Sequence, residues 1–251
     1  MCRRSMADFT DKTVLVTGSR GRLGAAAAAL LASLGATVVG ADLPEALDIP
    51  ATAPVVDEVP CDLTIENEVA ALAHHVASWH DRLDGILHTT YAQAEAELAE
   101  LSLADWNRVV AGCLTSGFLV CKHLVPLLAR SGGALVTTSS VLGREPTRAN
   151  GAYGAAKAGL AQLTRVAAVE YAAAGVRCVV LEPGDFKTRR EVDEMSASQR
   201  STIERATLAG RSATPDEVAR VAAFLLSDDA GYVNGVVVAA DGGFHGYTGL
   251  L

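Results

Sequence analysis

Three side chains that can share a proton come together in the stretch from Ser140 to Lys157. Tyr153 and Lys157 stand four positions apart, which places them on one face of a helix. A free phenol has a pKa of about 10, and a neighbouring ammonium favours the phenolate. We therefore expect Lys157 to let Tyr153 exchange a proton near neutral pH, while Ser140 hydrogen-bonds a substrate oxygen. Such a catalytic site interconverts a carbonyl and an alcohol, and it needs a hydride carrier.

The elements on either side of this stretch explain how the three side chains converge. The apolar, β-branched run that precedes Ser140 predicts a strand over Ala134–Thr138. After Tyr153, leucine and valine recur at helical spacing from Leu160 onward and predict a helix. The three candidate catalytic residues therefore lie where a strand ends and a helix begins.

A second motif, near the N-terminus, indicates where the hydride carrier binds. The apolar run Lys12–Thr17 predicts a strand, and Gly18–Gly24 follows it as G-S-R-G-R-L-G before an alanine-rich helix. The next predicted strand ends at Asp42. Glycines at such a turn let the backbone approach a diphosphate at a helix N-terminus, and the acid accepts hydrogen bonds from ribose hydroxyls. The pattern predicts dinucleotide binding.

The charged residues of this motif bear on which dinucleotide binds. A carboxylate at Asp42 would repel a 2′-phosphate, so we expect NAD rather than NADP as the cofactor. Arg20 and Arg22 flank the middle glycine of the turn. Either arginine could reach a phosphate, and either could equally be a solvated surface charge.

The order of elements along the whole chain predicts its fold. Strands alternate with helices throughout, which is typical of an α/β, Rossmann-like, doubly wound parallel sheet of about seven strands with helices on both faces. We expect a basic or disordered tail over residues 1–9 and a single dinucleotide-binding and catalytic domain over 10–251. The polar segment 185–211 follows a strand end, and we expect it to form a lid over the substrate.

The amino-acid composition argues against several classes of binding partner. A formal net charge of −8 argues against nucleic acid. The five cysteines are odd in number and form no C-x-x-C pair, so we expect reduced thiols, a cytoplasmic location and no metal site. The sequence predicts no membrane-spanning segment, because polar residues interrupt every long apolar run.

Five motifs occur in one order along the chain: T-G at 17–18, D-L-T at 62–64, the Ser140, Tyr153 and Lys157 spacing, P-G-D-F-K-T at 183–188 and V-A-A-D-G-G at 238–243. In this the chain resembles the short-chain dehydrogenase/reductase family, in its compact single-domain branch. The resemblance implies that Tyr153 is the acid/base, that Lys157 binds the nicotinamide ribose and that Asp62 meets the adenine. It also implies a homodimer or homotetramer, formed through helices near 105–128 and 153–173.

The resemblance and the two motifs together give a full set of candidate residues. Candidates for cofactor binding are Gly18, Arg20, Gly21, Leu23, Gly24, Asp42, Asp62, Leu63, His88, Thr90, Tyr153, Lys157, Pro183, Gly184, Phe186 and Thr188. Candidates for the substrate pocket are Tyr91, Cys113, Arg144 and Arg189.

Three departures from the family pattern leave two interpretations open. Arg22 stands at the usual middle glycine, H-T-T-Y at 88–91 replaces the usual N-N-A-G, and Cys113 replaces an asparagine that helps to relay protons. One interpretation is sequence drift in an ordinary enzyme, with His88 as an alternative proton route. The other is altered chemistry, with His88, Tyr91 and Cys113 facing the substrate.

The predicted function is therefore an oxidoreductase that transfers a hydride between a nicotinamide cofactor and a secondary alcohol or ketone. The alternative is a protein of the same fold without redox turnover. Such a protein would be a cyclase, dehydratase or isomerase, or it would bind the cofactor as a sensor.

Overall fold

Seven parallel strands form one sheet within residues 7–48 and 55–244, the part of the chain that the computed structural model describes. The strands lie in the order β3-β2-β1-β4-β5-β6-β7, so the predicted doubly wound sheet is confirmed. They are β1 (Thr13–Thr17), β2 (Thr37–Asp42), β3 (Asp57–Pro60), β4 (Gly85–His88), β5 (Ala134–Thr138), β6 (Arg177–Pro183) and β7 (Val237–Ala240).

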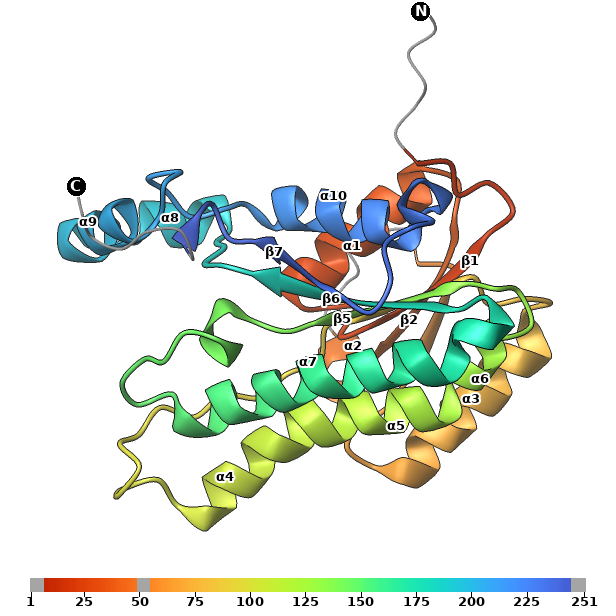
Figure 1. Ribbon diagram of the computed structural model, residues 1–251, viewed down its shortest axis with the longest axis horizontal. Helices are drawn as coiled ribbons and strands as arrows, with labels where there is room; N and C mark the ends of the chain where they lie inside the picture. The colour runs from red at the N-terminus through yellow and green to blue at the C-terminus, as the bar shows by residue number, and fades with distance from the viewer. Residues whose placement is uncertain (1–6, 49–54, 245–251) are drawn as a thin grey trace, which may run out of the picture.

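Helices cover both faces of this sheet (Figure 1). On one face α1 packs against α10, and on the other lie α3, the run from α4 to α6, and α7. The helices are α1 (Arg22–Ser33), α2 (Pro44–Leu47), α3 (Glu66–Trp79), α4 (Leu103–Val110), α5 (Ser116–His123), α6 (Val125–Leu128), α7 (Gly151–Tyr171), α8 (Arg189–Asp193), α9 (Ala197–Ala206) and α10 (Pro215–Leu226).

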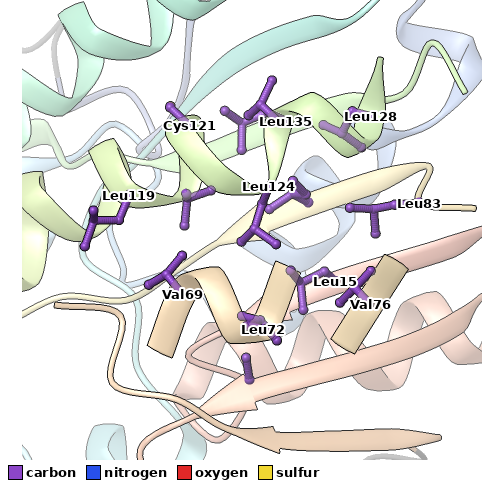
Figure 2. Close-up of a cluster of buried hydrophobic side chains, with 14 of the residues drawn as sticks. Leu15, Val69, Leu72, Val76, Leu83, Leu119, Cys121, Leu124, Leu128 and Leu135 are labelled. Carbon is purple, nitrogen blue, oxygen red and sulfur yellow. The ribbon is translucent and has the colours of Figure 1, made fainter. Parts of the chain in front are cut away.

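The core on the α3 side shows how helical spacing fixes this arrangement (Figure 2). Val69, Leu72 and Val76 lie on one face of α3 and are at most 1% exposed. They join Leu124 and the strand residue Leu15 in one buried cluster. Complete burial of such a side chain contributes about 1.5–3 kcal/mol, so this seam stabilises the sheet that carries the site.

The apolar stretch Leu103–Leu128 is not a uniform α-helix. A π-helical turn, Ala111–Thr115, separates α4 from α5, and the Ser116 hydroxyl donates to the Gly112 carbonyl at 2.8 Å. By length and hydropathy the stretch could cross a membrane, but 56% of its most apolar window is buried against the rest of the domain. A core helix of a globular domain has the same properties.

The domain begins earlier than the sequence predicted. Phe9 is 1% exposed within the core, and its backbone N–H donates to the Leu34 carbonyl at 3.0 Å. Ala7 is also buried. The predicted tail over residues 1–9 is therefore wrong for Ala7 to Phe9, because an aromatic ring near the chain end contributes to the core. Residues 1–6 lie outside the described part.

The segment predicted as a lid holds two short helices, α8 and α9, rather than irregular chain. Each helix starts with a capping box, formed by Thr188 with Glu191 and by Ser196 with Gln199. The S/T-x-x-E/Q spacing was visible in the sequence and indicates helix starts. Both helices lie beyond the edge of the sheet at which β6 and β7 end (Figure 1).

The order of the strands reverses between β1 and β4, and this reversal determines where a ligand site forms. Thr17 at the end of β1 pairs with Ala41 of β2 on one side and with His88 of β4 on the other. Connections on the two sides of β1 run in opposite directions, which leaves a crevice at the carboxyl ends of these strands. The Gly-rich turn and the catalytic candidates follow strands that end there.

Candidate active site

A cavity of about 680 Å³ lies at this end of the sheet. Its lining joins the Gly-rich turn, the end of β5, the start of α7, the turn after β6 and helix α9. Ten of the residues predicted from sequence line it, namely Arg20, Gly21, Leu23, Tyr91, Ser140, Tyr153, Lys157, Pro183, Gly184 and Phe186. The cofactor motif and the proton-transfer trio thus share one cavity.

The trio is held by hydrogen bonds that begin on β5. Lys157 is 1% exposed, and its Nζ donates to the Thr138 carbonyl at 2.7 Å. The Ser139 hydroxyl donates to the Lys157 carbonyl at 3.0 Å, which fixes the first turns of α7 against the strand end. The Lys157 Nζ lies 5.7 Å from the centre of the Tyr153 ring, and Tyr153 and Ser140 both line the cavity.

The proton on Tyr153 is held more tightly than the sequence suggested. Burial raises the pKa of the Tyr153 phenol above its ordinary value of 10.0, and the nearby Cys113 acts in the same direction. The hydrogen bond with Ser140 lowers this pKa without compensating. This structure therefore does not have the lowered Tyr153 pKa that the sequence predicted, because burial of the ring raises the pKa.

Burial also acts on Lys157. It lowers the pKa of the Lys157 ammonium from its ordinary value of 10.5. A buried ammonium costs several kcal/mol unless it is hydrogen-bonded, and the Thr138 carbonyl is its protein partner. Two donors of the ammonium remain for a ligand in the cavity.

The Gly-rich turn has the shape that a diphosphate requires. Gly18 has a φ of +68°, and a Cβ there would lie 2.7 Å from Thr89 Oγ1. A Cβ on Gly24 would lie 2.0 Å from the Gly18 carbonyl oxygen, so both positions must be glycine. Helix α1 begins at Arg22 after Gly21, which has no side chain to cap it. The N–H groups of its first turn are therefore open to an anion.

The two arginines of the turn have different partners. The Arg20 guanidinium pairs with Glu58 on the edge strand β3, and its side chain is 10% exposed. Its backbone N–H donates to the Asp42 carboxylate at 2.8 Å. Arg20 Nε and Nη1, Glu58 Oε1 and the Ser19 hydroxyl find no hydrogen-bond partner among the described residues. Buried donors of this kind at a cavity wall fit a polar ligand such as a dinucleotide.

Arg22 turns towards the other side of the cavity. Its Nη1 donates to Glu191 at 2.8 Å and to the Phe186 carbonyl at 3.3 Å, and its guanidinium lies 5.2 Å from the centre of the Phe186 ring. The nearby Tyr91 side chain helps to raise the pKa of Arg22, and both residues line the cavity. Two of the three sequence departures, Arg22 and Tyr91, therefore lie close together at one wall of the site.

His88 is a buried structural residue. It is fully buried, and its ring nitrogens contact the Thr17 hydroxyl at 2.9 Å and the Ser116 hydroxyl at 3.3 Å. Burial lowers the pKa of His88 to about 3, and the charge of Lys157 acts in the same direction. The idea that His88 faces the substrate or relays protons near neutral pH is wrong, because the ring stays neutral there.

The titration of His88 makes stability depend on pH. The unfolded chain binds a proton at this ring below about pH 6.5, and the folded protein binds it only near pH 3. The free energy of unfolding should therefore fall as pH drops through this window, by up to about 1.4 kcal/mol per pH unit. We expect the free energy of unfolding of His88→Asn to fall less steeply with decreasing pH than that of the parent. Urea unfolding at about pH 7, 6, 5 and 4 measures it.

The matched control is His74→Asn, which removes an exposed histidine from α3. It should show the parent's pH dependence. Equal slopes for the parent and the His88 variant would contradict the assignment of His88 as a buried neutral ring.

Three of the four substrate-pocket candidates lie outside the cavity lining. Cys113 is fully buried in the π-helical turn, where its thiol donates to the Ala92 carbonyl at 3.2 Å and accepts from the Ala92 N–H at 3.4 Å. Arg144 pairs with Glu145 at 3.6 Å at the surface, and Arg189 is exposed at the start of α8. These three expectations are wrong, because Cys113 contacts a loop, Arg144 is in a surface ion pair and Arg189 starts a helix.

Eight of the predicted cofactor residues support the cavity without lining it. Gly18 and Gly24 shape the turn, His88 is buried, and Asp42 accepts from Arg20. Asp62 accepts from the N–H and hydroxyl of Thr64 at 2.8 and 2.7 Å, and the neighbouring Leu63 is in the core. Thr90 contacts the Thr17 hydroxyl at 3.4 Å, and Thr188 caps α8.

Helix α9, within the segment predicted as a lid, provides one wall of the cavity through Thr202, Ile203 and Ala206, which the sequence analysis did not single out. Their spacing places them on one face of a helix, but charged residues stand between them, so the sequence shows little apolar periodicity there. Leu142 and Thr147 complete the wall from the segment between β5 and α7.

Known proteins resemble this chain over nearly its whole length. The family profile described as enoyl-(acyl carrier protein) reductase matches residues 19–245. A cis-4-hydroxycyclohexanecarboxylate dehydrogenase of Sinomonas cyclohexanicum is 40% identical over 244 residues, covering 94% of this chain and 97% of that protein. The chain belongs to the short-chain dehydrogenase/reductase family. It is an oxidoreductase of that family, whose dehydrogenases use nicotinamide cofactors.

Further relatives of this short-chain dehydrogenase/reductase agree with the assignment. A cyclohexanol dehydrogenase of an Acinetobacter species is 34% identical over 253 residues, covering 94% of this chain and 96% of that protein. The structure of a short-chain type dehydrogenase/reductase from Mycobacterium ulcerans superposes with a TM-score of 0.85 at 30% identity, covering 94% of this chain and 90% of that one.

Proposed function

We propose that this protein is an NAD-dependent dehydrogenase that interconverts a secondary alcohol on an aliphatic ring and the corresponding ketone. The observation that carries the proposal is the single cavity in which Ser140, Tyr153 and Lys157 meet the Gly-rich turn. A nicotinamide cofactor fits this cavity, because the uncapped start of α1 and the unpartnered donors of Arg20 are what a diphosphate or ribose would satisfy.

The chain's own residues carry the proton. Tyr153 donates its proton to the carbonyl oxygen in reduction and becomes a phenolate; in oxidation this phenolate accepts the proton from the substrate hydroxyl. Ser140 hydrogen-bonds the same oxygen and orients it towards the phenol. Lys157 stabilises the negative charge that develops on Tyr153. The bound cofactor supplies or accepts the hydride, held by the Gly-rich turn and the Pro183–Thr188 turn.

The remainder of the cavity lining supports the ring-bearing substrate. Leu142, Ile203, Ala206 and Phe244 give this part of the cavity its apolar surface, and the threonines Thr147, Thr202 and Thr207 lie among them. An apolar wall of this kind accepts a saturated ring and contributes binding energy by burying it. Two relatives carry names of cyclohexane derivatives that bear a hydroxyl group, which is the same chemistry.

Initial rates with NAD test this function. We expect cyclohexanol and cis-4-hydroxycyclohexanecarboxylate to raise the absorbance of the reduced nicotinamide, with kcat/KM higher than for an open-chain secondary alcohol of equal carbon number. Equal kcat/KM for ring and open-chain alcohols would contradict the ring preference. A failure to reduce NAD with any secondary alcohol would contradict the redox function and favour a non-redox or cofactor-sensing role.

The proposal extends to the oligomeric state of the protein and to its location in the cell. Trp106 and Phe118, on the run from α4 to α5, and Val166 and Val169, on α7, are large apolar residues exposed at the surface. Such exposed groups support self-association into a homodimer or homotetramer.

The cysteines among the described residues are free thiols, which supports a reducing, cytoplasmic location. We expect no nucleic-acid or membrane partner, and sedimentation analysis would measure the assembly.

A further inference from the structure

We propose that Arg22 is a direct ligand of the cofactor's diphosphate, that Tyr91 lies beside its guanidinium at the cavity wall and that Glu191 holds the guanidinium until the cofactor binds. The inference rests on the proposed use of a dinucleotide. It assigns a role to a side chain that replaces a glycine of the usual family turn.

The position of Arg22 is the first observation behind this proposal. It is the first residue of α1, directly after Gly21, and it lines the cavity. The open N–H groups of that helix turn already favour an anion there. A guanidinium on the same turn adds a planar, permanently charged donor that matches phosphate oxygens.

The contacts of Arg22 show which part of the cavity its charge faces. Phe186 and Tyr91, which both lie beside the guanidinium, line the cavity, and the charge of Arg22 favours the ionised form of Tyr153. Arg22 therefore lies towards the catalytic side, whereas Arg20 pairs with Glu58 of the edge strand β3. We expect Arg22 to contact the phosphate farther from the adenosine.

The contacts of Arg22 allow its guanidinium to exchange a protein partner for an anion. Its side chain is 39% exposed, so it can change partners at little cost. Glu191 also accepts from the Thr188 N–H at 2.7 Å and from the Thr188 hydroxyl at 2.8 Å, so this carboxylate keeps partners if Arg22 moves. Tyr91 lines the same cavity where the family has a glycine, and it helps to raise the pKa of the guanidinium, so the two departures act as a pair.

Binding measurements on the whole protein test this assignment. NADH binding is followed by fluorescence titration, and ADP and AMP are measured by displacement of NADH. In Arg22→Gln, which keeps the length of the side chain and removes the charge, we expect NADH and ADP affinities to fall about 10- to 100-fold. AMP, which lacks the outer phosphate, should bind within about threefold of the parent.

Two matched variants separate this role from structural ones. Arg190→Ala removes an 85%-exposed arginine from α8 and should leave NADH affinity unchanged. Glu191→Gln keeps the capping box and removes the charge that holds Arg22, so NADH should bind as tightly as in the parent or more tightly. A tenfold loss in Glu191→Gln would overturn the proposal, because Arg22 would then act only by tethering α8.

Two further outcomes would also overturn it. Unchanged NADH affinity in Arg22→Gln would show that the side chain is not a ligand. Equal losses for NADH, ADP and AMP would show that Arg22 only maintains the shape of the turn. A parent protein that binds no NADH would instead remove the proposed function, and this inference with it.

Discussion

Replacing Tyr153 with phenylalanine is expected to lower turnover by about 100-fold or more, while NADH still binds. Phenylalanine keeps the ring that packs against Val109, Cys113, Ala152 and Ala156, so the fold should persist. It removes the hydroxyl, which is the group that exchanges a proton with the substrate oxygen. Steady-state rates on an active alcohol and NADH fluorescence titration measure the two effects separately.

The same helix offers a matched control. Tyr171 lies at the far end of α7 and burial raises its pKa as well, but it packs in the core away from the cavity. Tyr171→Phe should keep parental turnover. If Tyr153→Phe were as active as Tyr171→Phe, the proton-transfer role of this site would be lost. A Tyr153 variant that also failed to bind NADH would indicate a structural role for the hydroxyl.

The fold and the catalytic trio were predictable because each rests on local spacing. The strand Ala134–Thr138 was predicted with the bounds that the structure has, since a run of apolar and β-branched residues suits a buried parallel strand. The four-residue spacing of Tyr153 and Lys157 determines that they share a helix face. The Gly-rich turn between a strand and a helix was sufficient to locate the cofactor end.

The fates of single long or titratable side chains were not predictable in this way. Arg20 and Arg22 are two positions apart, yet one pairs with Glu58 and the other with Glu191, and only the three-dimensional packing decides this. His88 is the last residue of β4, but whether its ring faces a cavity or the core depends on which elements pack against it. The raised pKa of Tyr153 likewise comes from burial, which spacing does not reveal.

The preference for NAD over NADP is expected to depend on two carboxylates near Arg20. Asp42 accepts from the Arg20 N–H at 2.8 Å, and Glu58 holds the Arg20 guanidinium. A 2′-phosphate placed here meets negative charge, and at an effective dielectric constant of about 20 two unit charges about 4 Å apart interact by about 4 kcal/mol. With screening by salt, we expect the parent to bind NADP about 100-fold more weakly than NAD.

Removing both charges should abolish this preference. In the double variant Asp42→Asn with Glu58→Gln, the Arg20 guanidinium loses its ionic partner and becomes available to a phosphate. We expect the ratio of NADP to NAD dissociation constants to fall by about 100-fold. Glu45→Gln is the control, since it removes one exposed negative charge from α2, the helix that follows β2, and should leave the ratio unchanged. A parent that already binds NADP more tightly would contradict the role of Asp42. A double variant with the parent's ratio would show that Arg20 cannot leave its place beneath the turn, even when Glu58 no longer holds it.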